Sequence, residues 1–343
     1  MNLNKIAFSL IISISVITIL VVGKDFIIPM ILALLIWFLI KEIRNYAGKL
    51  PLIGKKSPKW LLSILSTLIL FSVFGFVINV LIGNINNLTN NIDDYEKNVN
   101  QINSQLITQF KVDFLSMWSN YIGEFDFTSL LKDLLNSLTD LFGNAFMIGL
   151  YVLFLFFEES AFTPKLKALY PNQLKREETS VTLEKINTSI SKYITLKTIV
   201  SIITGTASYI ALSIIGVDTP LFWSFLIFIL NYIPTIGSLI ATLFPATIAL
   251  LQFGDLTHFF VVLGVIGFIQ VIVGNIIEPK MMGNTLNVSS LVVILSLSFW
   301  GLIWGITGMV LSVPITVIII ILFSQFESTK AIAILLSEKG QIN

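Results

Sequence analysis

Long stretches without any charged side chain are the feature of this sequence that most restricts how the chain can fold. Only 12% of the residues are charged and 55% are apolar, whereas soluble domains average about 25% charged residues. So few charges cannot cover the surface of a soluble globule, and about 20 apolar residues in a helix cross a bilayer core. The charge-free stretches are residues 6–23, 26–40, 60–92, 141–157, 198–217, 219–254, 259–277 and 281–325.

These stretches predict an all-α integral membrane protein that is polytopic, with about eight hydrophobic segments. Residues 1–23 are expected to be a span rather than a signal peptide, because they carry one lysine, Lys5, and no small-residue cleavage site. The expected divisions are three N-terminal transmembrane helices (1–83), an extracytoplasmic helical hairpin (84–142), a fourth transmembrane helix (143–157), a cytoplasmic amphipathic helical segment (158–195), a core with two broken helices (196–325) and a cytoplasmic tail (326–343).

The distribution of basic residues predicts the topology. Lysine and arginine are concentrated in 41–59 and 158–197, whereas most of the charged residues in 84–142 are acidic. Because lysine and arginine mark cytoplasmic loops, we expect both basic loops and both termini in the cytoplasm of a plasma or inner membrane. There is no cysteine for disulfides, and the net charge of +1 indicates no nucleic-acid partner, so the lipid bilayer is the expected environment.

The outer segment is predicted to be a helical hairpin. Its first helix continues the third span, and its second begins at Thr128. Two interpretations stay open: the helices pack within one chain, or they form a subunit contact or a cap on a pathway. The apolar residues of the first helix recur with the spacing of a coiled-coil seam, at Ile85, Leu88, Ile92, Tyr95, Val99, Ile102 and Leu106.

Two charge-free segments in the second half are interrupted near their middles. The first reads Asn231-Tyr-Ile-Pro-Thr-Ile-Gly237 before Pro245, and the second reads Trp300-Gly-Leu-Ile-Trp-Gly-Ile-Thr-Gly308 before Pro314. Proline removes a backbone donor and glycine permits unusual dihedral angles. Such interruptions at matching places in two repeats are the best sequence indication of a transporter binding site.

Two arrangements of these broken segments are compatible with the sequence. If both are re-entrant hairpins, they and the spans before them form two units of inverted topology. If each crosses the membrane once, the chain has eight spans. We favour the hairpins, because each segment is long for one span and short for two spans with a turn.

Several polar and backbone-permissive residues form the expected pathway for a solute or ion. Glu278 is the most informative, because ionisable groups in membranes are costly and a buried carboxyl can carry a proton near neutral pH; the alternative is a local pair with Lys280. The amides are expected either to bind solute or to link helices, and the glycines and proline to shape the backbone. The candidates are Asn231, Pro234, Gly237, Gln270, Asn275, Glu278, Lys280, Gly283, Gly305 and Gly308.

Other polar residues receive structural interpretations. Asp218-Thr-Pro220 and Asp255 are predicted helix N-caps, and Glu158 and Glu159 a solvated boundary of the fourth span. His258 is the only histidine, so it predicts no metal site. The sequence has no enzyme motif or cofactor signature and no nucleotide-binding loop, which leaves ion gradients as the expected energy source.

The interrupted segments and the stretch 270–283 resemble the AI-2E family of transporters, named for exporters of the quorum-sensing molecule autoinducer-2. The matching sequences are Asn231–Gly237 with Pro245, Gln270-Val-Ile-Val-Gly-Asn-Ile-Ile-Glu-Pro-Lys-Met-Met-Gly283, and 299–308 with Val313-Pro314. The resemblance implies export of a small polar solute by an ion-gradient-driven, homo-oligomeric carrier. Relatives are also linked to sodium/proton antiport, so a cation/proton antiporter using Glu278 stays open. A passive channel or a membrane scaffold is the third possibility.

Overall fold

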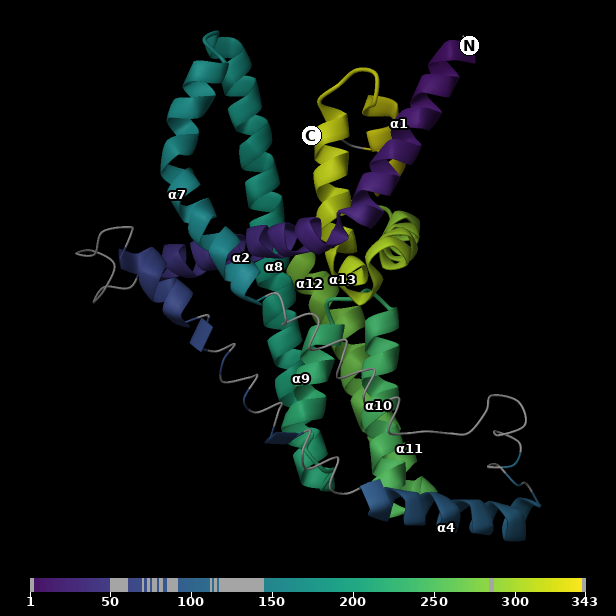
Figure 1. Cartoon of the computed structure of the whole chain (residues 1–343). Helices are drawn as coiled ribbons and strands as arrows, with labels where there is room; N and C mark the ends of the chain where they lie inside the picture. The colour runs from purple at the N-terminus through teal and green to yellow at the C-terminus, as the bar shows by residue number, and fades with distance from the viewer. Residues whose placement is uncertain are drawn as a thin grey trace. The chain divides into compact units, whose positions relative to one another are not determined.

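The regular elements of the protein are helical, and no strand occurs among the residues described (Figure 1). This confirms the predicted all-α membrane class. The chain divides into two compact units, one of Met1–Ser66, Thr139–Thr195 and Asn284–Asn343 and the other of Thr67–Leu138 and Leu196–Gly283. The computed structural model describes residues 3–49, 61–69, 71–72, 75, 79, 83–84, 92–111, 113, 116, 145–283 and 287–340.

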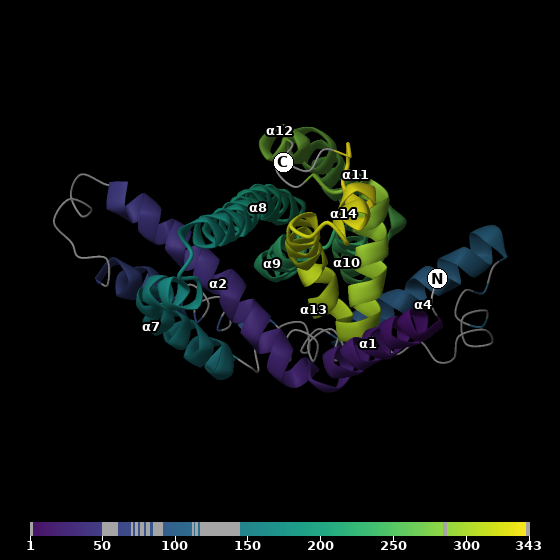
Figure 2. The same cartoon turned by 90° about the horizontal axis from the view of Figure 1, so that it is seen from above.

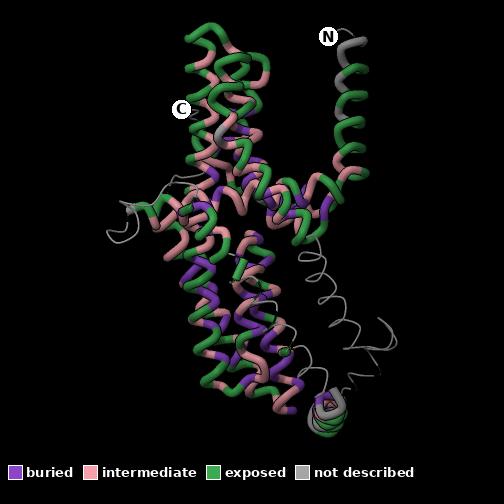
Figure 3. Tube along the Cα trace, turned by 60° about the vertical axis from the view of Figure 1, so that its left-hand side comes forward, coloured by how far each residue is buried: buried purple, intermediate pink, exposed green. Residues whose placement is uncertain are grey.

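Five of the described helices are long and apolar enough to cross a membrane, and a sixth is added if bent α7 (Ala145–Leu169) counts as one span. The two parts of α7 meet at 62° near residue 160. Pro164 accounts for the bend, because its ring clashes with the carbonyl four residues earlier. Many large apolar side chains are exposed, and α1, the helix at the N label, carries no buried residue among those described (Figure 3). Such a surface suits lipid.

In the first unit, α1 (Leu3–Val22) and α2 (Lys24–Lys49) meet at an angle at Gly23 (Figure 1). A Cβ at Gly23 would lie 2.7 Å from the carbonyl oxygen of Ile19, which explains why glycine stands there. The last carbonyls of α1 lack helical partners. The indole Nε1 of Trp304 donates to one of them, Leu20, at 2.9 Å.

Helix α13 (Ser290–Ser324) is folded back on itself at Gly305, which has φ 60° and ψ −142°. Twenty residues of straight helix rise about 30 Å, yet Ser296 and Thr316 are joined by a hydrogen bond between their hydroxyls. Ser296 Oγ also donates to the carbonyl of Ser312 at 3.1 Å. We call this folded segment hairpin 2; the buried side chains of Trp300, Trp304 and Leu311 form its core.

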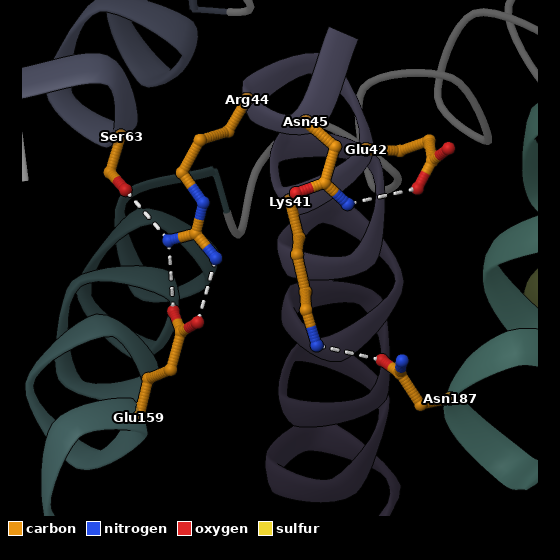
Figure 4. Close-up of polar contacts among 7 residues, drawn as sticks. All are labelled: Lys41, Glu42, Arg44, Asn45, Ser63, Glu159 and Asn187. Carbon is orange, nitrogen blue, oxygen red and sulfur yellow. Dashed lines mark hydrogen bonds and ion pairs between the residues drawn. The ribbon is translucent and has the colours of Figure 1, made fainter. Parts of the chain in front are cut away.

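A polar cluster links α2, α7 and α8 (Gln173–Ile215) in the first unit (Figure 4). Arg44 donates to both carboxylate oxygens of Glu159, at 3.1 and 2.7 Å, and to Ser63 Oγ at 2.9 Å. Lys41 donates to Asn187 Oδ1 at 2.9 Å. The prediction that Glu159 is a solvated boundary is therefore wrong, because the arginine fork holds its carboxylate. Its neighbour Glu158 is exposed and pairs with an exposed lysine.

The second unit contains α9 (Pro220–Leu230), α10 (Ile236–Phe253) and α11 (Leu256–Ile272), which run side by side (Figure 1 and Figure 2). A π-helical turn, Val273–Ile277, and α12 (Glu278–Met282) follow. The amphipathic helical segment expected over 158–195 contains the end of α7 and the start of α8, and α8 continues into the expected fifth span as a single helix of 43 residues. Asp255 caps α11 as predicted: it accepts from the backbone N–H of His258 at 2.8 Å, and this bond lowers the pKa of its carboxyl.

The first broken segment is also a helical hairpin. At one end the backbone N–H of Asp218 donates to Gln252 Oε1 at 2.6 Å, and between the arms Trp223 stacks on Phe244. The chain reverses over 231–235, where Thr235 has φ 61°. We call α9, this turn and α10 hairpin 1. Because the arms of both segments run back alongside each other, the prediction of hairpins is confirmed and the single-crossing alternative is wrong.

The part of the predicted first helix from Ile92 onward is helical, as α4 (Ile92–Phe110), and the seam residues Tyr95 and Ile102 are buried. Its predicted continuation from the third span through 85–91 lies outside the described residues. The second helix of that segment, expected from Thr128, lies outside the described residues. Helix α9 begins at Pro220, as the predicted N-cap Asp218-Thr-Pro220 requires. The capping side chain differs from the prediction: the N-cap is Thr219, with φ 51° and no side-chain bond, and Asp218 accepts from Tyr95 OH at 2.9 Å.

Both hairpins bring two backbones together at a glycine just after the turn. A Cβ on Gly237 would lie 1.9 Å from the carbonyl oxygen of Leu230, and one on Gly308 would lie 1.9 Å from that of Trp300. In each case the carbonyl carbon of the same residue comes next, followed by the Cβ of the residue four positions earlier, Ile233 or Trp304. The two interrupted segments that the sequence places at matching positions therefore close their hairpins in the same way.

We expect Gly237→Ala and Gly308→Ala each to lower stability by about 2 kcal/mol or more, because the added methyl group overlaps a carbonyl oxygen. Thermal unfolding of the protein in detergent measures this. Gly264→Ala is the control, since a Cβ there meets nothing within 4 Å. Wild-type melting of Gly237→Ala would contradict the close approach.

Candidate functional site

The turn of hairpin 1 is held against α8 by side-chain hydrogen bonds. Asn231 Nδ2 donates to Ser201 Oγ at 3.0 Å, and the hydroxyls of Thr198 and Tyr232 are 2.6 Å apart. Asn231 is buried and is the C-cap of α9. Pro234 ends the helix locally, because proline disfavours the helical conformation of the residue before it. The turn therefore presents its polar side chains to α8.

Helix α8 meets this turn with a buried polar stripe. Its members recur at intervals of four, three and four residues, which places them on one helix face. Gly205 lies beside the stripe, and a Cβ there would be 3.2 Å from the carbonyl oxygen of Ser224, so α8 and α9 approach closely. This stripe was not predicted, although the spacing of its residues was the available signal. The stripe consists of Lys197, Ser201, Thr204 and Ser208.

Glu278 is paired with Lys197, at 2.5 Å between Oε1 and Nζ. The lysine side chain is 5% exposed and the glutamate side chain 23%. The charge count assigned Lys197 to a cytoplasmic loop, but it is buried in α8. Removing a charged lysine from water is costly unless it is paired. Glu278 is thus the counter-ion of Lys197 rather than of Lys280.

The π-helical turn before Glu278 has a local cause. Pro279 has no N–H to donate to the carbonyl of Asn275, and its ring would press on that group. The backbone instead bonds from Glu278 N to the carbonyl of Val273, five residues back. This wider turn shifts the helix face on which Glu278 emerges, and such π-bulges are frequent at functional sites.

Gln270 is buried at 8% exposure, and its Nε2 has no hydrogen-bond partner among the described residues, as is also true of Ser208 Oγ in the stripe of α8. It belongs to the buried face of α11 with Val262 and Ile266. This face points to α10, since a Cβ on Gly267 would lie 3.8 Å from Thr242 Cγ2. Because α10 and α11 are antiparallel, Gln270 lies level with the start of α10, beside the turn of hairpin 1. A buried orphan donor calls for a water or a ligand.

The other predicted site residues lie elsewhere. Asn275 is exposed and donates to the carbonyl of Val271 at 3.1 Å, and Lys280 is also exposed. Gly283 ends α12 with φ 49°. Gly305 and Gly308 belong to hairpin 2, which lies in the other unit. The structure thus brings together Asn231, Pro234, Gly237, Gln270 and Glu278, and adds Lys197, Thr198, Ser201 and Tyr232 from outside the predicted set.

We call this arrangement the tip cluster, which combines neutral hydrogen-bonding groups with the Lys197–Glu278 ion pair. The neutral groups are the side chains of Asn231, Gln270, Thr198, Ser201 and Tyr232. Amide and hydroxyl groups suit a small, oxygen-rich solute. The pair adds a carboxylate and a buried ammonium group. Among the described residues the cluster thus offers both hydrogen-bonding groups and charges, the kinds of group that mark solute and ion pathways in membrane proteins.

We expect the two charges of the pair to differ in their effect on stability. Glu278→Gln leaves a lysine of 5% exposure without a counter-ion and should cost about 3 kcal/mol. Lys197→Gln leaves the more exposed glutamate and should cost about 1 kcal/mol. The double variant should recover part of the larger loss. Melting temperatures in detergent measure this order, and equal losses in the single variants would contradict it.

Comparison with known proteins identifies the chain. A family model described as AI-2E family transporter matches residues 9–328. The chain is 32% identical over 322 residues to AI-2 transport protein TqsA of Escherichia coli (strain K12), covering 92% of this chain and 90% of that protein. It is 31% identical over 325 residues to a putative transport protein of Haemophilus influenzae, covering 92% and 91%. Putative transport protein YhhT of Escherichia coli (strain K12) is 39% identical over 147 residues, 43% of this chain and 42% of that protein. The chain therefore belongs to the AI-2E family of transporters and is a multi-pass transporter of the cell membrane.

Proposed function

We propose that this transporter exports a small polar solute of the autoinducer-2 type, driven by an ion gradient, and that the solute binds at the tip cluster. The observation that carries this proposal is the buried Gln270 amide, which lacks a partner beside an irregular turn. Further support comes from the similar Escherichia coli protein, which is named for AI-2 transport. A solute rich in hydroxyl and carbonyl oxygens would accept the free N–H of Gln270.

The lengths of the hairpin arms support a site within the membrane. Helix α9 has 11 residues and α10 has 18, which rise about 16 and about 27 Å, so both arms are shorter than a hydrocarbon core of about 30 Å. The turn of a hairpin that enters the membrane with these arms lies inside the hydrocarbon core. Transporters with broken helices bind substrate within this core, where irregular backbone lines a cavity. With cytoplasmic termini, hairpin 1 would enter from outside.

The Lys197–Glu278 pair is the proposed coupling element. Protonation of Glu278, or a cation bound in place of Lys197, would break the pair and change the contacts that hold the turn of hairpin 1 to α8. The same pair favours a second candidate, a cation/proton antiporter, in which the ion is the cargo. In both cases the driving energy is an ion gradient.

Transport in proteoliposomes separates these candidates. We expect a proton gradient to accumulate labelled autoinducer-2 and the Glu278→Gln variant to lose this accumulation by at least about tenfold, while solute exchange without a gradient persists. Glu327→Gln is the control, since its side chain is 95% exposed.

Normal accumulation by Glu278→Gln would remove this carboxyl from the mechanism. A cation-dependent change of internal pH without organic solute would instead support the antiporter. Solute flux at a rate that is independent of every imposed ion gradient would identify a passive channel.

The Gln270→Leu variant tests the solute site without relying on loss of stability. Removing an orphan amide should leave the melting temperature unchanged or raise it. The apparent KM for the solute should rise roughly three- to tenfold, as for one lost hydrogen bond. Asn275→Leu, at an exposed position, should keep the wild-type KM. A lower melting temperature with unchanged KM would assign Gln270 a structural role only.

A further inference from the structure

Helix α4 contacts both chain connections at the base of hairpin 1 (Figure 1). Tyr95 OH donates to Asp218 Oδ2 at 2.9 Å, in the connection between α8 and α9. Asn98 Nδ2 donates to the carbonyls of Leu251 and Gln252, at 2.8 and 2.9 Å, in the last turn of α10. Carbonyls of a last helical turn lack partners within the helix, so Asn98 supplies a donor that α10 needs.

Both connections contain a glycine with positive φ. Gly216 has φ 85° and Gly254 has φ 67°, a region that glycine adopts at little cost. Gln252 joins the two connections, because its Oε1 accepts from Asp218 N at 2.6 Å and its Nε2 donates to the carbonyl of Gly216 at 2.8 Å. Hairpin 1 is therefore attached through two glycine joints, and α4 lies across both.

The described contacts between α4 and the base of hairpin 1 include polar ones, made by Asn98 and Tyr95. Among the described side chains of α4, only Tyr95 and Ile102 are buried, at 3% and 9% exposure. Water can replace the hydrogen bonds of Asn98 and Tyr95, and segments with few buried apolar contacts open at low free energy. Release of the described part of α4 would thus expose two buried side chains.

We propose that α4 is a detachable clasp on hairpin 1, that Asn98 is its principal positioning residue, and that the clasp opens during the transport cycle. With α4 in place, both joints are held and the turn of hairpin 1 stays against α8. With α4 released, the hairpin rotates about Gly216 and Gly254, and Asn231 and Tyr232 separate from Ser201 and Thr198 to open the tip cluster. Such hinges lie where a few terminal residues absorb the change of dihedral angles. The inference rests on the proposed function in that hairpin 1 carries the solute site.

A reversible cross-link tests the clasp directly, because the chain contains no cysteine of its own. The Cβ of Asn98 lies 3.5 Å from the position of a Cβ on Gly254, and disulfides have Cβ separations of about 3.5–4.5 Å. The full-length variant N98C/G254C, oxidised or reduced, is compared with each single cysteine variant, which reports the effect of the substitution and of the oxidant alone. Hydrogen exchange at 229–237 is measured in detergent, and autoinducer-2 transport and binding in proteoliposomes.

Oxidation of the double variant should slow hydrogen exchange at 229–237 at least threefold and lower the transport rate at least tenfold. Solute binding should weaken as well, because the tip cluster stays closed, and reduction should restore exchange, transport and binding. Unchanged exchange and unchanged transport after complete cross-linking would overturn the clasp and identify α4 as a static strut. If the wild-type protein moves no autoinducer-2, the proposed cargo fails, and the exchange measurement still decides whether α4 controls hairpin 1.

Discussion

In a chain that faces lipid, every backbone N–H and C=O has to be satisfied within the protein, and the two hairpins depend on this constraint. At Gly237 and Gly308 the absence of a side chain lets one arm of the hairpin approach a carbonyl of the other arm so closely that a Cβ would overlap it. Where the helices α1 and α10 end, side chains from distant parts of the sequence, Trp304 and Asn98, donate to the freed carbonyls. Irregular backbone is thus retained because tertiary contacts complete its hydrogen bonds.

The same constraint concentrates polar side chains at the turn of hairpin 1. Proline and the reversal of the chain interrupt the helix there, and α8 meets the interruption with Lys197 and the hydroxyls that follow it. Several of these groups bond one another, whereas Ser208 Oγ and Gln270 Nε2 have no hydrogen-bond partner among the described residues. An incompletely satisfied polar cluster in an apolar protein is unfavourable for folding alone, which is a physical reason to associate it with a ligand.

Several parts of the fold and the site were predictable because their signals are local. The Gly/Pro interruptions predicted two hairpins, and the 3-4 spacing of apolar residues predicted α4. The capping role of Asp255 follows from its position immediately before an apolar helix. Asn231, Gln270 and Glu278 were recognisable as polar groups in apolar sequence, and their polarity is costly in lipid wherever the chain folds. The roles of Asp218 and Glu159 were mispredicted, because Tyr95 and Arg44 reach them from positions more than 100 residues away.

The sequence by itself determined the membrane class, the interruption of two segments and the family, since these depend on hydropathy, on backbone chemistry and on short motifs. The tertiary structure decided which charges and amides meet. Lys197 belongs by charge count to a loop, and only the packing of α8 buries it beside Glu278. Asn275 and Gln270 are both amide residues within the same apolar stretch, yet Asn275 is exposed and Gln270 is buried facing α10. The reason is that the energy of a polar group in a membrane protein depends on its partner, and partners distant in sequence are brought together by the packing of helices.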